Sequence, residues 1–141
     1  MAISAKLQFG DNDCGQYSSE FPVIWCKCHF SRRYNHFRPE SVARCERITI
    51  KLIAPGKDDL SLYEWYAGGS VLSGRILFNM AMRNTLDEET KEILFEDAHC
   101  ISLAELYDID ISEQRMLTLD IVSEKIVVDF VEFENKEDRN G

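Results

Sequence analysis

The chain has 141 residues, of which 45% are apolar and 11% aromatic, and its formal net charge is -9. This length suits one domain with one core, and the composition excludes an intrinsically disordered chain. No apolar run reaches the roughly 20 residues that span a bilayer, and the negative charge disfavours nucleic acid and anionic membrane surfaces as partners. We expect a single domain over residues 1–133 and a flexible acidic tail over 134–141, which contains no apolar residue.

Alternation of apolar and polar residues predicts β-strands along most of the chain. In the first strand, Ile3, Ala5, Leu7 and Phe9 alternate with polar side chains, and a turn over 10–15 follows. Pro22, inside the second extended run, marks an edge, a bend or a bulge. The predicted extended runs cover residues 3–9, 16–34, 47–54, 75–82, 91–107, 112–122 and 125–133.

One short helix is predicted within residues 54–69. Leu62, Trp65 and Tyr66 fall on one helical face, which we expect to pack against the strands. Asp58, Asp59 or Ser61 can cap its start, Ser61 and Glu64 match a capping box, and Gly68 with Gly69 ends it.

The order of these elements predicts a mainly β fold. Consecutive strands without crossover helices exclude a parallel α/β sheet, so we expect an antiparallel barrel or a pair of packed sheets. Gly74 is interpreted as a turn residue after the helix. Residues 32–44 are predicted to form a long loop, or a bent continuation of the flanking strands, and long loops often carry function.

The charges are divided along the sequence. Residues 1–83 carry a balance of +3 and residues 84–141 a balance of -12. If the two halves form different surfaces, the basic patch of one copy can meet the acidic patch of another. The alternative is that these charges solubilise the protein or pair within one subunit.

Five cysteines form an odd set without a Cys-x-x-Cys pair, which argues against a disulfide framework. Cys26 and Cys28 share a strand face and lie near His29 and His36, so a zinc site can be considered. Zinc usually requires four ligands in paired clusters, and packed thiols are the favoured interpretation. We expect no metal and no cofactor.

Candidate catalytic groups are scarce. Asp97 and His99 would share a strand face, and a carboxylate beside an imidazole can serve acid–base catalysis. No nucleophile motif, phosphate-binding glycine loop or His-Glu-x-x-His sequence accompanies them. We therefore expect no catalytic residues and no enzyme.

Several segments together resemble a known family. They are residues 7–12, 34–39, 43–48, 54–69, 73–76 and 91–98, and they resemble a divergent branch of the haemolysin-coregulated proteins (Hcp) of type VI secretion systems. The resemblance spans nearly the whole chain. It implies a two-sheet β-barrel with one helix on its side and an extended loop, and hexameric rings that stack into the inner tube of a contractile injection machine.

The resemblance also implies partners and a location. The partners would be other copies of the chain, the sheath, the spike protein and effectors in the lumen. The residues 1–7 are strand-like rather than signal-like, so we expect a cytoplasmic protein exported by the type VI machine. The loop and the charges suggest a subunit interface at Arg32, Arg33, Tyr34, His36, Phe37 and Arg38, with the acidic stretch 87–92 or the C-terminal half as its complement. The alternatives are a small-ligand-binding barrel and an enzyme built on Asp97 and His99.

Overall fold

The computed structural model describes residues 4–32, 34–39, 44–56, 58–81, 88–107, 115–129 and 131–134. Within these residues the chain is mainly β with one short helix, as predicted. The elements are β1 (Ser4–Asp11), β2 (Gln16–Ser31), β3 (Tyr34–Asn35), β4 (Arg38–Pro39), β5 (Arg44–Ile53), α1 (Ser61–Gly68), β6 (Leu72–Ala81), β7 (Glu88–Tyr107), β8 (Arg115–Val122), β9 (Lys125–Val128) and β10 (Val131–Glu134).

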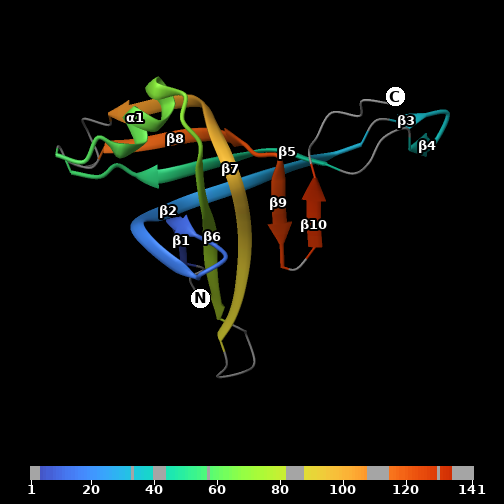
Figure 1. The fold of residues 1–141 in the computed structure, drawn as a ribbon, viewed down its shortest axis with the longest axis horizontal. Helices are drawn as coiled ribbons and strands as arrows, with labels where there is room; N and C mark the ends of the chain where they lie inside the picture. Colours follow the sequence, from blue (N-terminus) through green and yellow to red (C-terminus); the bar gives the residue numbers. More distant parts are fainter. Residues whose placement is uncertain are drawn as a thin grey trace.

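The strands close into an antiparallel barrel. Hydrogen-bonded neighbours run in the order β7, β6, β1, β2, β5 and β8, and β8 pairs again with β7. The long strand β7 makes this closure possible, because Glu88–Ala98 face β6 and His99–Tyr107 face β8. Figure 1 shows β7 running across the molecule, with the β9–β10 hairpin beside it. The predicted two-sheet barrel is confirmed.

The interior of the barrel is filled by its own side chains. Inward positions alternate along the strands, and Leu7, Ile50 and Leu119 are among the fully buried residues. Phe9 lies at the centre of an aromatic cluster and meets the rings of Phe21, Trp65 and Phe95 edge-on, at centroid distances of 5.9, 5.2 and 6.1 Å. In the described residues the space that a ligand-binding barrel would keep open is thus occupied by core, which gives that alternative no support.

The helix begins differently from the prediction. Its N-cap is Leu60, which makes no side-chain capping bond, so the predicted Ser61–Glu64 capping box is wrong. Asp59 instead accepts hydrogen bonds from the Ser61 backbone N–H and hydroxyl, at 3.1 and 2.6 Å, in the turn before the helix. The predicted end is confirmed, because Gly69 adopts the left-handed conformation, with φ 67°.

The helix packs on β7 through its first and middle residues. Leu62 and Trp65 are buried, and the Trp65 indole N–H donates a 3.0 Å hydrogen bond to the Ala98 carbonyl. The prediction that Tyr66 also packs inward is wrong, since it is 48% exposed in the last turn of a helix of only eight residues. Tyr63 packs against the core instead, and its hydroxyl donates to Glu105 of β7.

Gly74 is not a turn residue. It lies inside β6, paired with Phe9 of β1, and a Cβ atom there would lie 2.1 Å from the Gln8 carbonyl oxygen. Glycine is required at this position by the close approach of two strands. Near Pro22, the expected irregularity is a bulge at Ile24 in the β2–β5 ladder.

Other strand boundaries differ from the predicted ones by a few residues. Strand β7 begins at Glu88, three residues before the predicted run 91–107, and β10 includes Glu134, the first residue of the predicted tail. Residues 135–141 lie outside the described residues, so the prediction of a flexible tail stays a prediction. Within the described part of the chain, no helix has the length and apolar character needed to cross a membrane.

Candidate assembly interface

The predicted loop at 32–44 contains a short hairpin that projects from the barrel. Strands β3 and β4 pair only with each other, through Tyr34 with Pro39 and Asn35 with Arg38. Figure 1 shows this hairpin beyond the ends of β2 and β5, away from the barrel. We call Arg32 and residues 34–39 the arm. Of the predicted interface residues, Arg33 lies outside the described residues, and the other five belong to the arm.

The tip of the arm has an unusual backbone. His36 and Phe37 both have positive φ angles, 49° and 71°, which is the pattern of a type I′ hairpin turn. Asn and Gly are preferred at these positions, and the left-handed conformation costs other residues about 1–2 kcal/mol. Phe37 is 101% exposed, so this aromatic side chain makes no contact that offsets the cost within its own chain. An exposed, strained aromatic at the end of an arm indicates a contact surface.

The arm is also basic. Arg32 and Arg38 are exposed, as is His36 at the tip. Because these groups stand in solvent on a projection, they can reach an acidic surface of another molecule. The structure thus brings together the arginines, the imidazole and Phe37, but it places them on a hairpin rather than an irregular loop.

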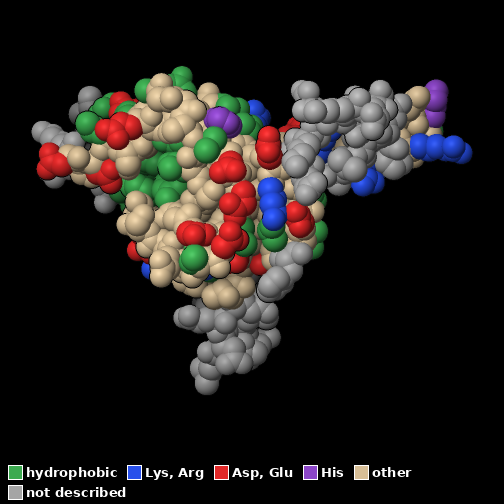
Figure 2. Space-filling view, viewed as in Figure 1, with side chains coloured by type: hydrophobic (Ala, Val, Ile, Leu, Met, Phe, Trp, Pro, Cys, Tyr) green, Lys and Arg blue, Asp and Glu red, His purple; other side chains and the backbone are tan. Residues whose placement is uncertain are grey.

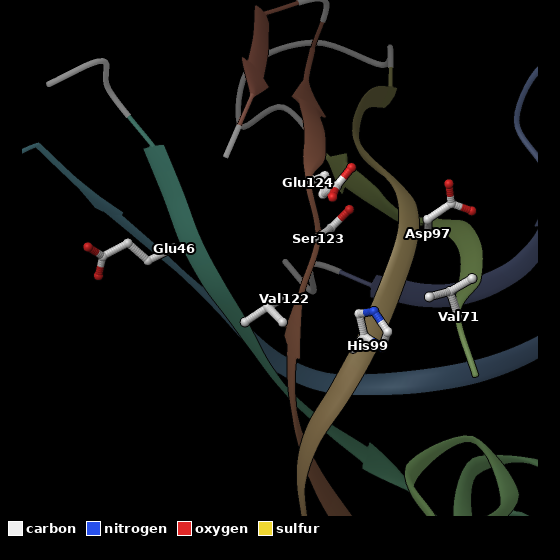
Figure 3. A pocket seen from close by; sticks show the side chains of 7 residues that line it. All are labelled: Glu46, Val71, Asp97, His99, Val122, Ser123 and Glu124. Carbon is white, nitrogen blue, oxygen red and sulfur yellow. The ribbon is translucent and has the colours of Figure 1, made fainter. Parts of the chain in front are cut away.

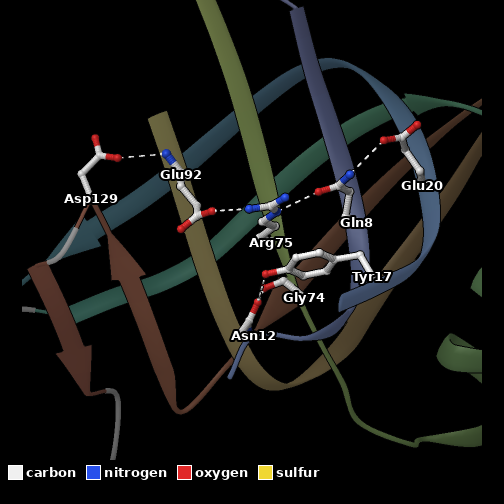
Figure 4. Close-up of polar contacts among 8 residues, drawn as sticks. All are labelled: Gln8, Asn12, Tyr17, Glu20, Gly74, Arg75, Glu92 and Asp129. Carbon is white, nitrogen blue, oxygen red and sulfur yellow. Dashed lines mark hydrogen bonds and ion pairs between the residues drawn. The ribbon is translucent and has the colours of Figure 1, made fainter. Parts of the chain in front are cut away.

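The acidic stretch 87–92 is a weaker candidate for the surface that binds the arm than the sequence suggested. Asp87 lies outside the described residues, and Glu92 is engaged within its own chain, where its carboxylate lies 2.6 Å from the Arg75 guanidinium. Arg75 also donates to Gln8, at 2.7 Å, and covers the Tyr17 ring at 4.2 Å. Figure 4 shows Arg75 held between Gln8 and Glu92 across three strands. Glu92 therefore serves the fold of its own subunit.

A second acidic region lies over β7 and the β9–β10 hairpin. Figure 2 shows carboxylates gathered on this side of the molecule. Its exposed acidic residues are Asp97, Glu124, Asp129 and Glu132. One ion pair within the hairpin, Lys125 with Glu132 at 3.6 Å, neutralises part of this charge.

A cavity of about 520 Å³ opens beside this region, and we call it the side cavity. Its lining residues are Glu46, Val71, Asp97, His99, Val122, Ser123 and Glu124. Figure 3 shows that they come from β5, the segment before β6, strand β7, the end of β8 and the turn between β8 and β9. The lining includes three carboxylates and two valines, which suits an apolar group that carries positive charge.

Backbone irregularities hold the side cavity open. Asp97 has a φ of 49° at a break in the β6–β7 register, and its backbone N–H donates to the Ser73 hydroxyl at 2.9 Å. Ser123 is buried, and its hydroxyl donates to the Glu96 carbonyl. The predicted pair Asp97 and His99 both line the cavity. Sequence reasoning missed the other five lining residues. Among the described residues, no group of three or more His, Cys, Asp and Glu side chains has the arrangement of a metal site.

The described residues define the chain as a closed antiparallel β-barrel protein whose interior is filled by core and from which an arm projects. The chain belongs to the family described as haemolysin-coregulated protein Hcp (TssD), whose model matches residues 1–136. No curated protein sequence matches the chain.

Solved Hcp structures share the fold at low sequence identity. Hcp1 from Flavobacterium johnsoniae is 20% identical, with a TM-score of 0.65 over 96% of this chain and 100% of that one. The secreted protein Hcp3 from Pseudomonas aeruginosa is 11% identical, with a TM-score of 0.54 over 99% and 98%. A type VI secretion system effector from Yersinia pestis is 10% identical, with a TM-score of 0.58 over 99% and 94%.

Membership of this family defines the role of the chain. It is a structural subunit of the inner tube of the type VI secretion system, in a family that assembles into hexameric rings. Proteins of this family are secreted by type VI systems.

Proposed function

We propose that this tube subunit contacts neighbouring copies through the arm, and that the tip of the arm enters the side cavity of the next copy. The observation that carries the proposal is Phe37, a fully exposed aromatic side chain held at positive φ. Burial in a neighbour removes its apolar surface from water, which offsets the backbone strain. The interface comprises Arg32, Arg33, Tyr34, His36, Phe37 and Arg38.

The side cavity is complementary to the arm in charge and in apolar character. Val71 and Val122 provide apolar surface for the Phe37 ring, and Asp97 and Glu124 stand beside them to receive Arg38. Such a contact joins two different surfaces of identical chains, so its repetition generates a ring or a stack. Burial of the Phe37 ring supplies the affinity of the contact. The charged groups determine its register and which partner is bound.

The arm is tested by substitution at its tip. Phe37→Ser and Arg38→Glu are expected to lower the assembly constant at least tenfold, measured by light scattering and by counting rings in negative-stain images. Tyr66→Ser is the matched control, because Tyr66 is an exposed aromatic on α1, away from the arm. Assembly of Phe37→Ser at the level of the control would refute the arm as the contact.

The side cavity is tested by exchanging charges. Glu124→Lys is expected to weaken assembly, and the combination with Arg38→Glu to restore it, because the ion pair is then reversed rather than broken. Unchanged assembly of Glu124→Lys would exclude this cavity as the receptor of the arm, and loss in both single variants without rescue in the pair would exclude a direct Arg38–Glu124 ion pair.

The other partners follow from the family role. We propose that the sheath surrounds the assembled tube, that the spike protein caps it and that effectors travel in its lumen. The shared fold of the Yersinia pestis effector supports an association between this architecture and effector delivery. Export from the cytoplasm through the machine is tested by detection of the chain in culture medium, which must be lost when the sheath is deleted.

A further inference from the structure

Three thiols meet inside the barrel near the base of the arm. Cys26 and Cys28 lie on the inward face of β2, opposite the buried Ile50 and Ile48 of β5, and Cys45 lies on β5 itself. All five cysteines of the chain are present as thiols. Cys26 and Cys28 are half-buried, whereas Cys45 is fully buried.

A β-bulge in β5 turns the Cys45 side chain toward the interior of the barrel. In regular alternation Cys45 would point outward with Arg47, since Ile48 points inward. The ladder pairs His29 with Arg47 and then Phe30 with Cys45, so Glu46 is the extra residue on β5. One extra residue reverses the alternation, which turns Cys45 inward beside Cys28.

The three sulfur atoms form a connected row with Cys28 in the middle. Cys28 lies within side-chain interaction range of both Cys26 and Cys45. The Cys45 thiol also reaches the Arg47 carbonyl oxygen, at 3.9 Å. Lys91 approaches Cys28 from β7, where it occupies the same inward row as Ile93 and Phe95. Each of these neighbours favours a negative charge on the Cys28 sulfur.

These neighbours shift the pKa values of the three thiols in different directions. Hydrogen bonds from Cys26 and Cys45, together with Lys91 and His29, lower the pKa of the Cys28 thiol. The hydrogen bond to Cys28 and then burial raise the pKa of Cys26 and of Cys45, which keep their protons. Cys28 is therefore the thiol of the cluster that ionises most readily, and thiolates are the form that oxidants attack.

We propose that Cys28 and Cys45 form an oxidisable thiol pair, which hydroperoxides convert into a disulfide between β2 and β5. This modification site is independent of where the arm docks. The half-buried Cys28 gives a small oxidant access, and Cys45 is the thiol partner on the adjacent strand.

The reaction balances with one hydroperoxide. The Cys28 thiolate attacks the peroxide oxygen and displaces hydroxide, which leaves a sulfenic acid on Cys28. The Cys45 sulfur then attacks that sulfur, and the sulfenic oxygen leaves as water. Two thiols and one hydrogen peroxide give one disulfide and two waters, so each sulfur loses one electron and the peroxide gains two.

The disulfide would staple the strands that carry the arm. The β2–β5 ladder ends with Ser31 opposite Arg44, next to Cys45 and three residues beyond Cys28. A link at this point closes a short loop that contains the whole arm, which restricts the unfolded chain and fixes the base of the hairpin. For the intact domain we expect a rise in Tm of roughly 5–10 °C on oxidation.

Digestion with trypsin, followed by mass spectrometry, identifies directly which two cysteines are joined. Cleavage after Lys27, Arg32, Arg44 and Arg47 separates Cys26 from Cys28 and releases the peptides 28–32 and 45–47. The native protein is treated with hydrogen peroxide, alkylated with N-ethylmaleimide, denatured, alkylated again with a second reagent, digested and analysed by mass spectrometry. We expect these two peptides joined, restoration of both thiols by dithiothreitol and the rise in Tm.

Variants and controls complete the test. Cys28→Ser should abolish the link, whereas Cys14→Ser, at an exposed cysteine remote from the cluster, should retain it. The experiment on the chain without substitutions tests the proposal even if Cys28→Ser fails to fold. Five alkylatable thiols after oxidation, or a product dominated by Cys26 or Cys14, would overturn the proposal.

Discussion

Gly74 has the closest backbone contact of the glycines in the described part of the chain. An alanine Cβ there would lie 2.1 Å from the Gln8 carbonyl oxygen and 3.0 Å from the Phe9 Cα atom. Both obstacles are backbone, so strands β1 and β6 must separate. We expect Gly74→Ala to lower the free energy of unfolding by about 1–3 kcal/mol, measured by urea denaturation. Gly56→Ala, with open space around its Cβ position, is the control, and equal stability of the two variants would contradict this explanation.

Tyr63 makes the stability of the barrel sensitive to alkali. Burial, followed by the hydrogen bond to Glu105, raises the pKa of Tyr63 to about 12. The unfolded chain loses this proton near pH 10, so the contribution of Tyr63 is complete below pH 10 and disappears as the pH rises towards 12. Tyr63→Phe should flatten the fall in unfolding free energy over this interval, and Tyr66→Phe should leave it unchanged. An identical pH profile for all three proteins would rule out the Tyr63 contribution.

Single positions show what local pattern can and cannot predict. Leu62 and Trp65 were correctly predicted as core because helical spacing alone places them on one face. Tyr66 shares that spacing, but a helix of eight residues leaves the barrel before its last turn can pack. Gly74 was taken for a turn because its reason for being glycine is a carbonyl on β1, 66 positions away in the sequence.

Trp65 is the largest of the buried side chains that attach the helix α1 to the barrel. Trp65 is 2% exposed, donates to the Ala98 carbonyl and meets the Phe9 ring edge-on. Trp65→Phe removes the hydrogen bond, leaves a buried carbonyl without its donor and opens a small cavity, so a loss of about 2–4 kcal/mol is expected in urea denaturation. Tyr66→Leu, on the exposed side, should cost less than about 0.5 kcal/mol. Comparable losses in the two variants would mean that Trp65 is not the anchor.

The elements of the candidate site were predictable to different degrees. The arm was found because residues 32–44 break the strand alternation and carry arginines and aromatics. Its hairpin was not predicted, since His36 and Phe37 replace the Asn and Gly that normally mark a type I′ turn. The side cavity could not be assembled from sequence, because Glu46, Val71 and Glu124 are brought together only by strand pairing and two bulges.

At the scale of the molecule, closure of the barrel mixes the two charged halves of the sequence. Strand β6 belongs to the basic half and β7 to the acidic half, yet they are neighbours in the sheet and share the Arg75–Glu92 ion pair. The division along the chain is therefore only partly a division of the surface. The arm keeps its positive charge because it projects from the barrel. The carboxylates of Asp97 and Glu124, near the side cavity, are exposed on the surface of the barrel itself.

Closure also predicts that the barrel unfolds as one unit. Strand β7 pairs with β6, β8 and β9, so its release breaks the pairing of strands from both halves of the sequence. The chain has two tryptophans, and Trp25 is 44% exposed on β2. In Trp25→Phe the remaining fluorescence reports the packing of α1 on β7, while circular dichroism reports all strands. We expect the two signals to give one urea transition with the same midpoint at a fixed protein concentration. Separate midpoints would show that the helix side detaches before the barrel opens, and would contradict a single cooperative domain over residues 1–133.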